Sequence, residues 1–291
     1  MLTFGTATID TVTDLDPFVL PVDLLFPGRS LETLRTHEAL LAPDHIDFDA
    51  GNILLGVHSH VVRVNDLVIL IDTCVGEHKP RPRRADWDQR AASGYLERLA
   101  AIGIRPEDVD VVLCTHLHAD HVGWNTQLLD GRWVPTFPRA RYLIGRSEYA
   151  RWQAEEQRLP GTHNHGSFAD SVAPVVEAGL AEWVEDGFEL GPNLSLMALP
   201  GHTVGQLGLC LCHGERKAFF CADAIHSPVQ VYEPDWASRF CSDPQAAIAT
   251  RRTLLERVVD TDDLLVPAHL RNSAAMQIVR SGDGYAPVFI P

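Results

Sequence analysis

The stretch that most constrains this chain is Val111–Trp124, which reads VVLCTHLHADHVGW. It begins as a short apolar run with β-branched residues at its head, which predicts a buried strand. Three histidines and an aspartate follow within six residues: His116, His118, Asp120 and His121. Neutral imidazole and carboxylate are the usual ligands of zinc and similar metals. In an extended turn His116 and His118 point the same way, and the other two can face a neighbouring point, so we expect ligands for two metal ions.

The composition indicates an ordinary globular protein with an acidic balance. The chain has 291 residues, 45% of them hydrophobic, and a formal net charge of −15. Charge repulsion disfavours nucleic acid, anionic membranes and polyanionic substrates as partners. The first residues lack the basic and apolar segments of a signal peptide, no apolar run has transmembrane length, and the six cysteines lack C-x-x-C pairing. We therefore expect a cytoplasmic protein with reduced cysteines.

Four more polar residues follow apolar runs that predict strands. Asp72 ends the run Leu67–Asp72, His202 lies in a tight loop between two expected strands, and Asp223 directly follows Phe219–Ala222. His269 ends Leu264–His269, which we predict to be the last strand. Strand ends at one edge of a layered α/β fold converge, so these side chains can meet the first cluster.

The rest of the chain predicts one domain over residues 1–291 with two strand-rich halves, near 1–160 and 180–291. Within 1–50 we expect a strand over 2–10 and then an irregular arm that packs on the domain or on a second subunit. Helical spacing predicts helices over 88–102, 147–157 and 171–178, and a helix that Asp243 caps and that ends near Val259. The remaining histidines that we considered as ligands, and expect not to be, are His58, His60, His163 and His165.

Five motifs in this order resemble the metallo-β-lactamase superfamily: Asp72 in LIDT, the H-x-H-x-D-H run, His202 in PGHT, Asp223 after a strand, and His269 near the end. The resemblance implies an α/β fold, a four-layered αβ/βα sandwich with two mixed β-sheets and metals at one edge. It implies two divalent ions, expected to be Zn²⁺. The first ion would be bound by His116, His118 and His202, and the second by Asp120, His121 and His269. Asp223 would bridge the two ions. Asp72 would not bind an ion itself but would orient a ligand histidine.

Departures from the family pattern argue against several branches of the superfamily. Class B β-lactamases have a cysteine, or no bridging carboxylate, where this chain has Asp223, and the diiron oxygen-reducing branch has an acidic residue at the position of His118. The tRNA-processing ribonucleases must attract RNA, which an acidic chain does not favour. The chain therefore looks like the lactonase, arylesterase and methyl-parathion-hydrolase-like branch.

That resemblance implies a hydrolase in which a metal-bridging hydroxide attacks the carbonyl of a small neutral lactone or ester. Asp120 or His226 would pass the proton to the leaving group. Aromatic residues near the ligands in sequence are candidate walls of the substrate pocket: Trp124, Tyr232, Trp236 and Phe240. A phosphotriesterase or a thioesterase on the same site, and a non-catalytic metal-binding protein, remain alternatives. A homodimer is compatible with the apolar arm.

Overall fold

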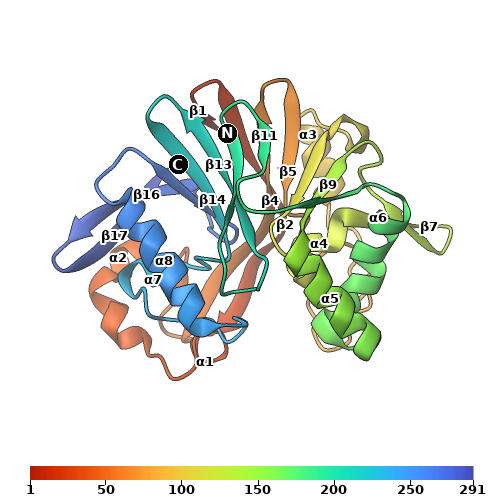
Figure 1. The fold of residues 1–291 in the computed structure, drawn as a ribbon. Helices are drawn as coiled ribbons and strands as arrows, with labels where there is room; N and C mark the ends of the chain where they lie inside the picture. Colours follow the sequence, from red (N-terminus) through yellow and green to blue (C-terminus); the bar gives the residue numbers. More distant parts are fainter. Residues whose placement is uncertain (291) are drawn as a thin grey trace. The chain divides into compact units, whose positions relative to one another are not determined.

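The computed structural model describes residues 1–290, which form two compact units drawn from separate parts of the sequence (Figure 1). Unit 1 contains Met1, Thr6–Leu15 and Val57–Glu185; unit 2 contains Leu2–Gly5, Asp16–Gly56 and the residues from Asp186 on. The observed boundary after Glu185 lies close to the expected one, but residues 16–56 belong with the C-terminal half. That both units form one domain stays a prediction.

The first sheet carries the parallel strands that lead into the predicted ligands. Its order is β1-β2-β4-β5-β6-β9-β10, with β3 paired to β4. The turn Asn65-Asp66, with φ of +52° and +62°, joins β4 to β5 as an antiparallel hairpin. Strands β5, β6, β9 and β10 run parallel to one another, which explains their nearly continuous apolar sequences. The bounds are β1 Leu2–Phe4, β2 Ala7–Pro21, β3 Ile46–Asp47, β4 Asn52–Val64, β5 Leu67–Ile71, β6 Val111–Cys114, β9 Arg141–Gly145 and β10 Ala181–Val184.

Short helices and one hairpin complete unit 1. Helix α5 (Arg146–Arg158) packs beside β9, and α6 (Ala173–Glu177) contacts β8 (Arg132–Pro135) (Figure 1). The helix predicted over 88–102 covers only α3 (Tyr95–Ala101) in the structure. Gly94 is left-handed at φ +75°, and the backbone before it forms hydrogen bonds within its own loop. We did not predict the hairpin of β7 (Thr126–Leu129) and β8, although Asp130-Gly131 is a hairpin signal. The other helical segments are η2 Pro106–Asp108, α4 Ala119–Val122, η3 Gly123–Asn125, η4 His163–Gly166 and η5 Phe168–Val172.

Unit 2 contains a seven-stranded mixed sheet in sequential order, β11 to β17. Helix α8 (Pro244–Val258) connects the parallel pair β14 and β15, and Leu255 and Val258 on it pack on Phe219, Leu265 and Ile278. The predicted cap is confirmed, since the Asp243 carboxylate accepts the amides of Gln245 and Ala246. The prediction of a last strand at Leu264–His269 is wrong, because the hairpin β16–β17 follows it. The bounds are β11 Glu189–Gly191, β12 Leu194–Ala198, β13 Leu207–His213, β14 Arg216–Ala222, β15 Leu264–Pro267, β16 Ala275–Ser281 and β17 Gly284–Ile290.

The N-terminal arm is more ordered than its sequence suggested. Strand β2 continues to Pro21, and α1 (Val22–Leu25), η1 (Leu31–His37) and α2 (Glu38–Leu41) follow. Phe26 is fully buried and packs its ring on Trp236, with centroids 5.6 Å apart, inside unit 2. Leu20, Leu25 and Phe26 of the arm are therefore covered by this chain, whereas Val19 and Leu40 are each 43% exposed. A homodimer stays a prediction.

Two further expectations concern the whole chain. The two mixed sheets with helices confirm the α/β class. All six cysteines are free, and four of them are buried. Among residues 1–290 there is no helix with the length and apolar character that crossing a membrane requires.

Candidate metal centre

In unit 1 the predicted ligands lie on the segment that follows β6: His116 and His118 precede helix α4, and Asp120 and His121 lie within it. The Nε2 atom of His116 lies 3.1 Å from Nδ1 of His118, and Nε2 of His121 lies 3.8 Å from the Asp120 carboxylate. His116 and His121 are buried, whereas His118 and Asp120 keep partial exposure. The loop therefore presents two pairs of donor atoms, as its spacing predicts.

The Asp72 carboxylate organises this loop from the end of β5. Its Oδ1 accepts the Thr115 amide at 2.8 Å, and its Oδ2 accepts the Thr115 hydroxyl and Nδ1–H of His121, both at 2.8 Å. Since the Thr115 hydroxyl proton goes to Asp72, the hydroxyl oxygen accepts Nδ1–H of His116 at 3.1 Å. Both imidazoles thus carry their proton on Nδ1, so Nε2 is the nitrogen with which each could hold a metal ion.

The backbone of Thr73–Gly76 fixes the other end of the loop. The Thr73 amide donates to the His121 carbonyl, and the Gly123 amide donates to the Cys74 carbonyl, both at 2.7 Å. A Cβ on Gly123 would lie 1.9 Å from the Val75 oxygen, so only glycine permits this approach. The Thr73–Gly76 segment is in turn held by buried Asp14, whose carboxylate accepts the Val75 and Gly76 amides and pairs with Arg90 at 2.9 Å.

In unit 2 three histidines converge on one buried carboxylate. The Nε2 atoms of His202, His226 and His269 lie 3.2–3.3 Å from the oxygens of Asp223. His202, Asp223 and His226 form a group whose ligand atoms lie within 4.8 Å of one another. The sequence predicts His202, Asp223 and His269 here as ligands, and places His226 near them only as a proton carrier.

Local geometry aims these side chains at Asp223. Nδ1–H of His269 donates to the Gly56 carbonyl at 2.8 Å. The loop of His202 is fixed by Gly201, at φ +126°, where a Cβ would lie 2.1 Å from the Ala247 nitrogen. The thiol of Cys241 lies 3.6 Å from Nδ1 of His202, and burial raises the pKa of this thiol to about 11, so it stays protonated at neutral pH. The sequence contained no signal for Cys241.

The donor sets fit a bound cation. Because His269 carries its proton on Nδ1, its Nε2 lone pair faces Asp223 Oδ1 at 3.2 Å, so two acceptors oppose each other. In unit 1 the Nε2 lone pair of His121 likewise faces the Asp120 carboxylate. Such pairs repel unless a proton or a cation lies between them, and imidazole with carboxylate suits zinc and similar ions.

The candidate wall residues differ in their exposure. Trp124 is buried, stacks on Tyr95 at 5.2 Å and donates its indole N–H to Asp14 at 3.4 Å. Trp236 is buried against Phe26. Tyr232 is half-buried and stacks on His37, with ring centroids 3.9 Å apart, whereas Phe240 is 44% exposed. Tyr232 and Phe240 therefore keep exposed surface, whereas the two tryptophans pack on other side chains. That these four residues line a substrate pocket stays a prediction.

The histidines that we expected not to be ligands have other surroundings. His58 and His60 are buried and pack edge to face at 4.9 Å. His163 pairs with Glu155 at 3.2 Å. His165 is half-buried against Trp87, and burial lowers its pKa.

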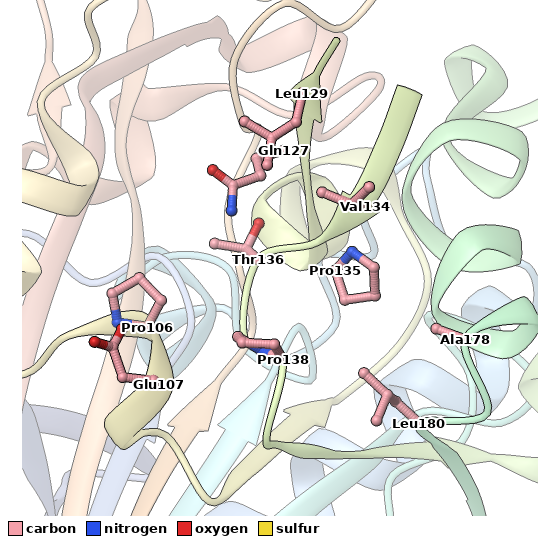
Figure 2. Close-up of a pocket in the computed structure, with 10 residues that line it drawn as sticks. All are labelled: Pro106, Glu107, Gln127, Leu129, Val134, Pro135, Thr136, Pro138, Ala178 and Leu180. Carbon is pink, nitrogen blue, oxygen red and sulfur yellow. The ribbon is translucent and has the colours of Figure 1, made fainter. Parts of the chain in front are cut away.

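A separate cavity of about 610 Å³ lies in unit 1 and contains none of the predicted ligands (Figure 2). Figure 2 shows that its wall is largely proline and aliphatic, with Glu107 at one end. The residues that line it are Pro106, Glu107, Gln127, Leu129, Val134, Pro135, Thr136, Pro138, Ala178 and Leu180.

Known proteins resemble this chain over the region that carries both ligand sets. The model of the metallo-beta-lactamase superfamily matches residues 53–269. N-acyl homoserine lactonase AiiB of Agrobacterium fabrum is 27% identical over 197 residues, which cover 61% of this chain and 66% of that protein. Hydroxyacylglutathione hydrolase of Aeromonas salmonicida is 31% identical over 143 residues, covering 48% and 41%. The chain thus matches less than two thirds of the length of either relative.

A solved structure shows the same fold over the whole chain. The dizinc quorum-quenching lactonase AidC, in complex with a product, superposes with a TM-score of 0.76 at 18% identity, covering 100% of this chain and 96% of AidC. The family match covers well over half of the chain, so the protein belongs to the metallo-β-lactamase superfamily. The predicted αβ/βα sandwich fold of this family is confirmed.

Proposed function

We propose that this protein is a hydrolase that binds two divalent metal ions, most simply Zn²⁺, and opens small neutral lactones. The observation that carries the proposal is the orientation of three imidazoles. His116, His121 and His269 each use Nδ1–H for a hydrogen bond to the protein, and each directs Nε2 toward another possible metal ligand. The seven residues of the resemblance are the proposed ligands: His116, His118, Asp120, His121, His202, Asp223 and His269.

When bound, two such ions lower the pKa of a shared water and polarise a carbonyl oxygen. The residues of this chain then have separate tasks. Asp72 holds two ligand imidazoles in one tautomer, directly at His121 and through Thr115 at His116. His226, buried and 3.2 Å from Asp223, is the proposed carrier of the proton to the leaving alkoxide, and Asp120 is the other candidate.

The substrate class follows from charge and from the rim of unit 2. A net charge of −15 disfavours anionic substrates by repulsion. Exposed Phe240 and half-buried Tyr232 offer aromatic surface to an acyl chain or an aryl group. The similarity to two lactonases, AiiB and AidC, supports a lactone as the substrate.

A thioesterase is the second candidate, because hydroxyacylglutathione hydrolase is 31% identical over its matched part. Glutathione is anionic, and we found no basic stretch after Asp223 to bind it. A phosphotriester, neutral like a lactone, should be a weak side substrate.

The test combines metal analysis with steady-state kinetics on the purified protein. We expect two ions per chain and the highest kcat/KM on N-acyl homoserine lactones or other neutral lactones, followed by aryl esters and phosphotriesters. Activity should fall on acidification, because protons compete with metal for imidazole and carboxylate. A glutathione thioester or an anionic phosphodiester that exceeds every lactone by about tenfold in kcat/KM would overturn the substrate assignment. One ion or none in metal-replete protein would overturn the metal centre.

A further inference from the structure

In the tripeptide Leu117–Ala119 the two residues on either side of His118 are buried. The tripeptide follows β6, and only Ala119 belongs to α4. Leu117 and Ala119 are each 1% exposed. Buried backbone amides and carbonyls need partners, because an unpaired one costs about as much as a lost hydrogen bond. The His118 carbonyl accepts the His121 amide at 3.0 Å, whereas the Leu117 amide, the Leu117 carbonyl and the Ala119 amide bond to side chains.

Two side chains from later in the sequence bond to this tripeptide. Oε1 of Glu148 accepts the Leu117 amide at 3.1 Å. Oδ1 of Asn164 accepts the Ala119 amide at 3.0 Å, and Nδ2 of Asn164 donates to the Leu117 carbonyl. His118 therefore lies between two residues whose backbone is fixed from outside the loop.

Glu148 also controls what lies against the His118 ring. It is 1% exposed in the first turn of α5, and its Oε1 accepts the indole N–H of Trp152 at 2.7 Å. The Trp152 ring meets the imidazole of His118 edge to face, with centroids 5.6 Å apart at 70°. One carboxylate thus positions both the backbone that precedes His118 and the aromatic ring that limits its rotation.

Asn164 is itself held in an unusual backbone conformation. Its φ and ψ are +48° and +40°, in the left-handed region that asparagine tolerates better than most residues. The next residue, His165, is also left-handed, and buried Arg81 donates to its carbonyl at 3.0 Å. Arg81 also forms a two-pronged pair with Asp170 at 2.6 and 2.8 Å. The segment is therefore anchored directly after Asn164, the residue that bonds to the ligand loop.

We propose that Glu148 and Asn164 are positioning residues that pre-organise His118 for metal binding. This inference rests on the proposed function, since it requires the two-metal centre. Loss of either residue leaves the ligand itself in place but frees the tripeptide around it. Outer partners of this kind contribute about 10–100-fold to metal affinity. The loss should fall on the ion that His118 binds and leave the other ion nearly unaffected.

The test is a Co²⁺ titration of metal-free protein, followed by its visible absorption, with a competing chelator to resolve two affinities. Glu148→Leu and Asn164→Gly should each weaken one ion by about 10–100-fold and change its absorption bands. Asn164→Gly keeps the left-handed backbone and removes only the side chain. Glu148→Gln keeps an acceptor for Leu117 and Trp152, so it should restore most of the affinity. Gln157→Ala, at an exposed position on the same helix, is the matched control.

The melting temperature of each metal-free variant separates positioning from loss of fold. If Glu148→Leu does not fold, Asn164→Gly decides. Folded Asn164→Gly or Glu148→Leu protein that binds both ions with wild-type affinity would overturn the inference while leaving the proposed function intact. Wild-type protein that does not bind two ions would instead overturn the proposed function.

Discussion

The two ligand sets are built in opposite ways. In unit 1 four predicted ligands lie within six residues, and side chains from elsewhere in the unit, among them Asp72 and Glu148, hold their loop. In unit 2 the ligands lie up to 67 residues apart, and their side chains meet directly at Asp223. In unit 1 the geometry of the predicted ligands therefore depends on side chains that hold one contiguous loop. In unit 2 it depends on Asp223, on which the other side chains converge.

Removing that residue should give the largest effect. Asp223→Ala leaves His202, His226 and His269 without the carboxylate on which they converge. We expect kcat/KM to fall roughly 10³-fold or more, since metal-based charge stabilisation contributes several kcal/mol. Metal content should fall below two ions per chain. Asp120→Ala in unit 1 is the matched change, and if it costs as much as Asp223→Ala, the central role of Asp223 is wrong.

The glycines at the two loops test whether both regions depend equally on close backbone contact. Gly123→Ala in unit 1 and Gly201→Ala in unit 2 would each place a Cβ about 2 Å from backbone atoms. Each should lower the free energy of unfolding by about 3 kcal/mol, at the upper end for overpacking. Gly191→Ala, where a Cβ meets no atom within 4 Å and φ is not positive, is the control. Denaturant unfolding measures all three, and equal values for all three would refute the prediction.

The residues that hydrogen-bond to the predicted ligands should contribute more to metal affinity in unit 1 than in unit 2. Asp72→Asn removes the charge that binds Nδ1–H of His121, and the new amide can donate where an acceptor is needed. We expect metal affinity to fall about 10–100-fold. Cys241→Ser, behind His202, should cost less than about tenfold, because a thiol is only a weak partner. Chelator competition measures both, and a larger loss in Cys241→Ser would reverse the comparison.

The smallest expected effect is on the pH dependence of stability, and it comes from a histidine that is not a predicted ligand. Burial lowers the pKa of His45 in unit 2 to about 4, and its Nδ1 has no hydrogen-bond partner among residues 1–290. Between pH 6.5 and 4 the unfolded chain then binds more protons than the folded one, so stability falls as the pH falls. The expected loss from His45 is about 1.5 kcal/mol between pH 6.5 and 5.

Unfolding of metal-free His45→Gln protein checks this assignment. The pH slope should be shallower than in the metal-free wild type, because glutamine does not titrate. An unchanged slope would mean that other groups cause the pH dependence.

The sequence predicted which side chains gather within each unit because each follows an apolar run, and the run itself shows where a strand ends. That these side chains bind metal stays a prediction. The sequence could not predict their supports. Asp14 and Arg90 are 76 residues apart, and nothing in either local sequence indicates the contact. The composition of the basic, proline-rich stretch Lys79–Arg84 predicts a solvated loop, but Lys79 and Arg81 are fully buried with Asp170, about 90 residues away. A local run of charged residues shows only the composition of a segment. Whether the segment is buried depends on which distant part of the chain packs against it.

The order of the ligands along the chain has a consequence for synthesis on the ribosome. His121 is made 148 residues before His269. At about 5–20 residues per second, that interval lasts roughly 7–30 s. The supports of the unit 1 loop, through Asp170, are translated early in this interval, whereas Asp223 and His269 come late. A nascent chain can thus shape its first loop of predicted ligands well before the residues that would complete the proposed centre are made.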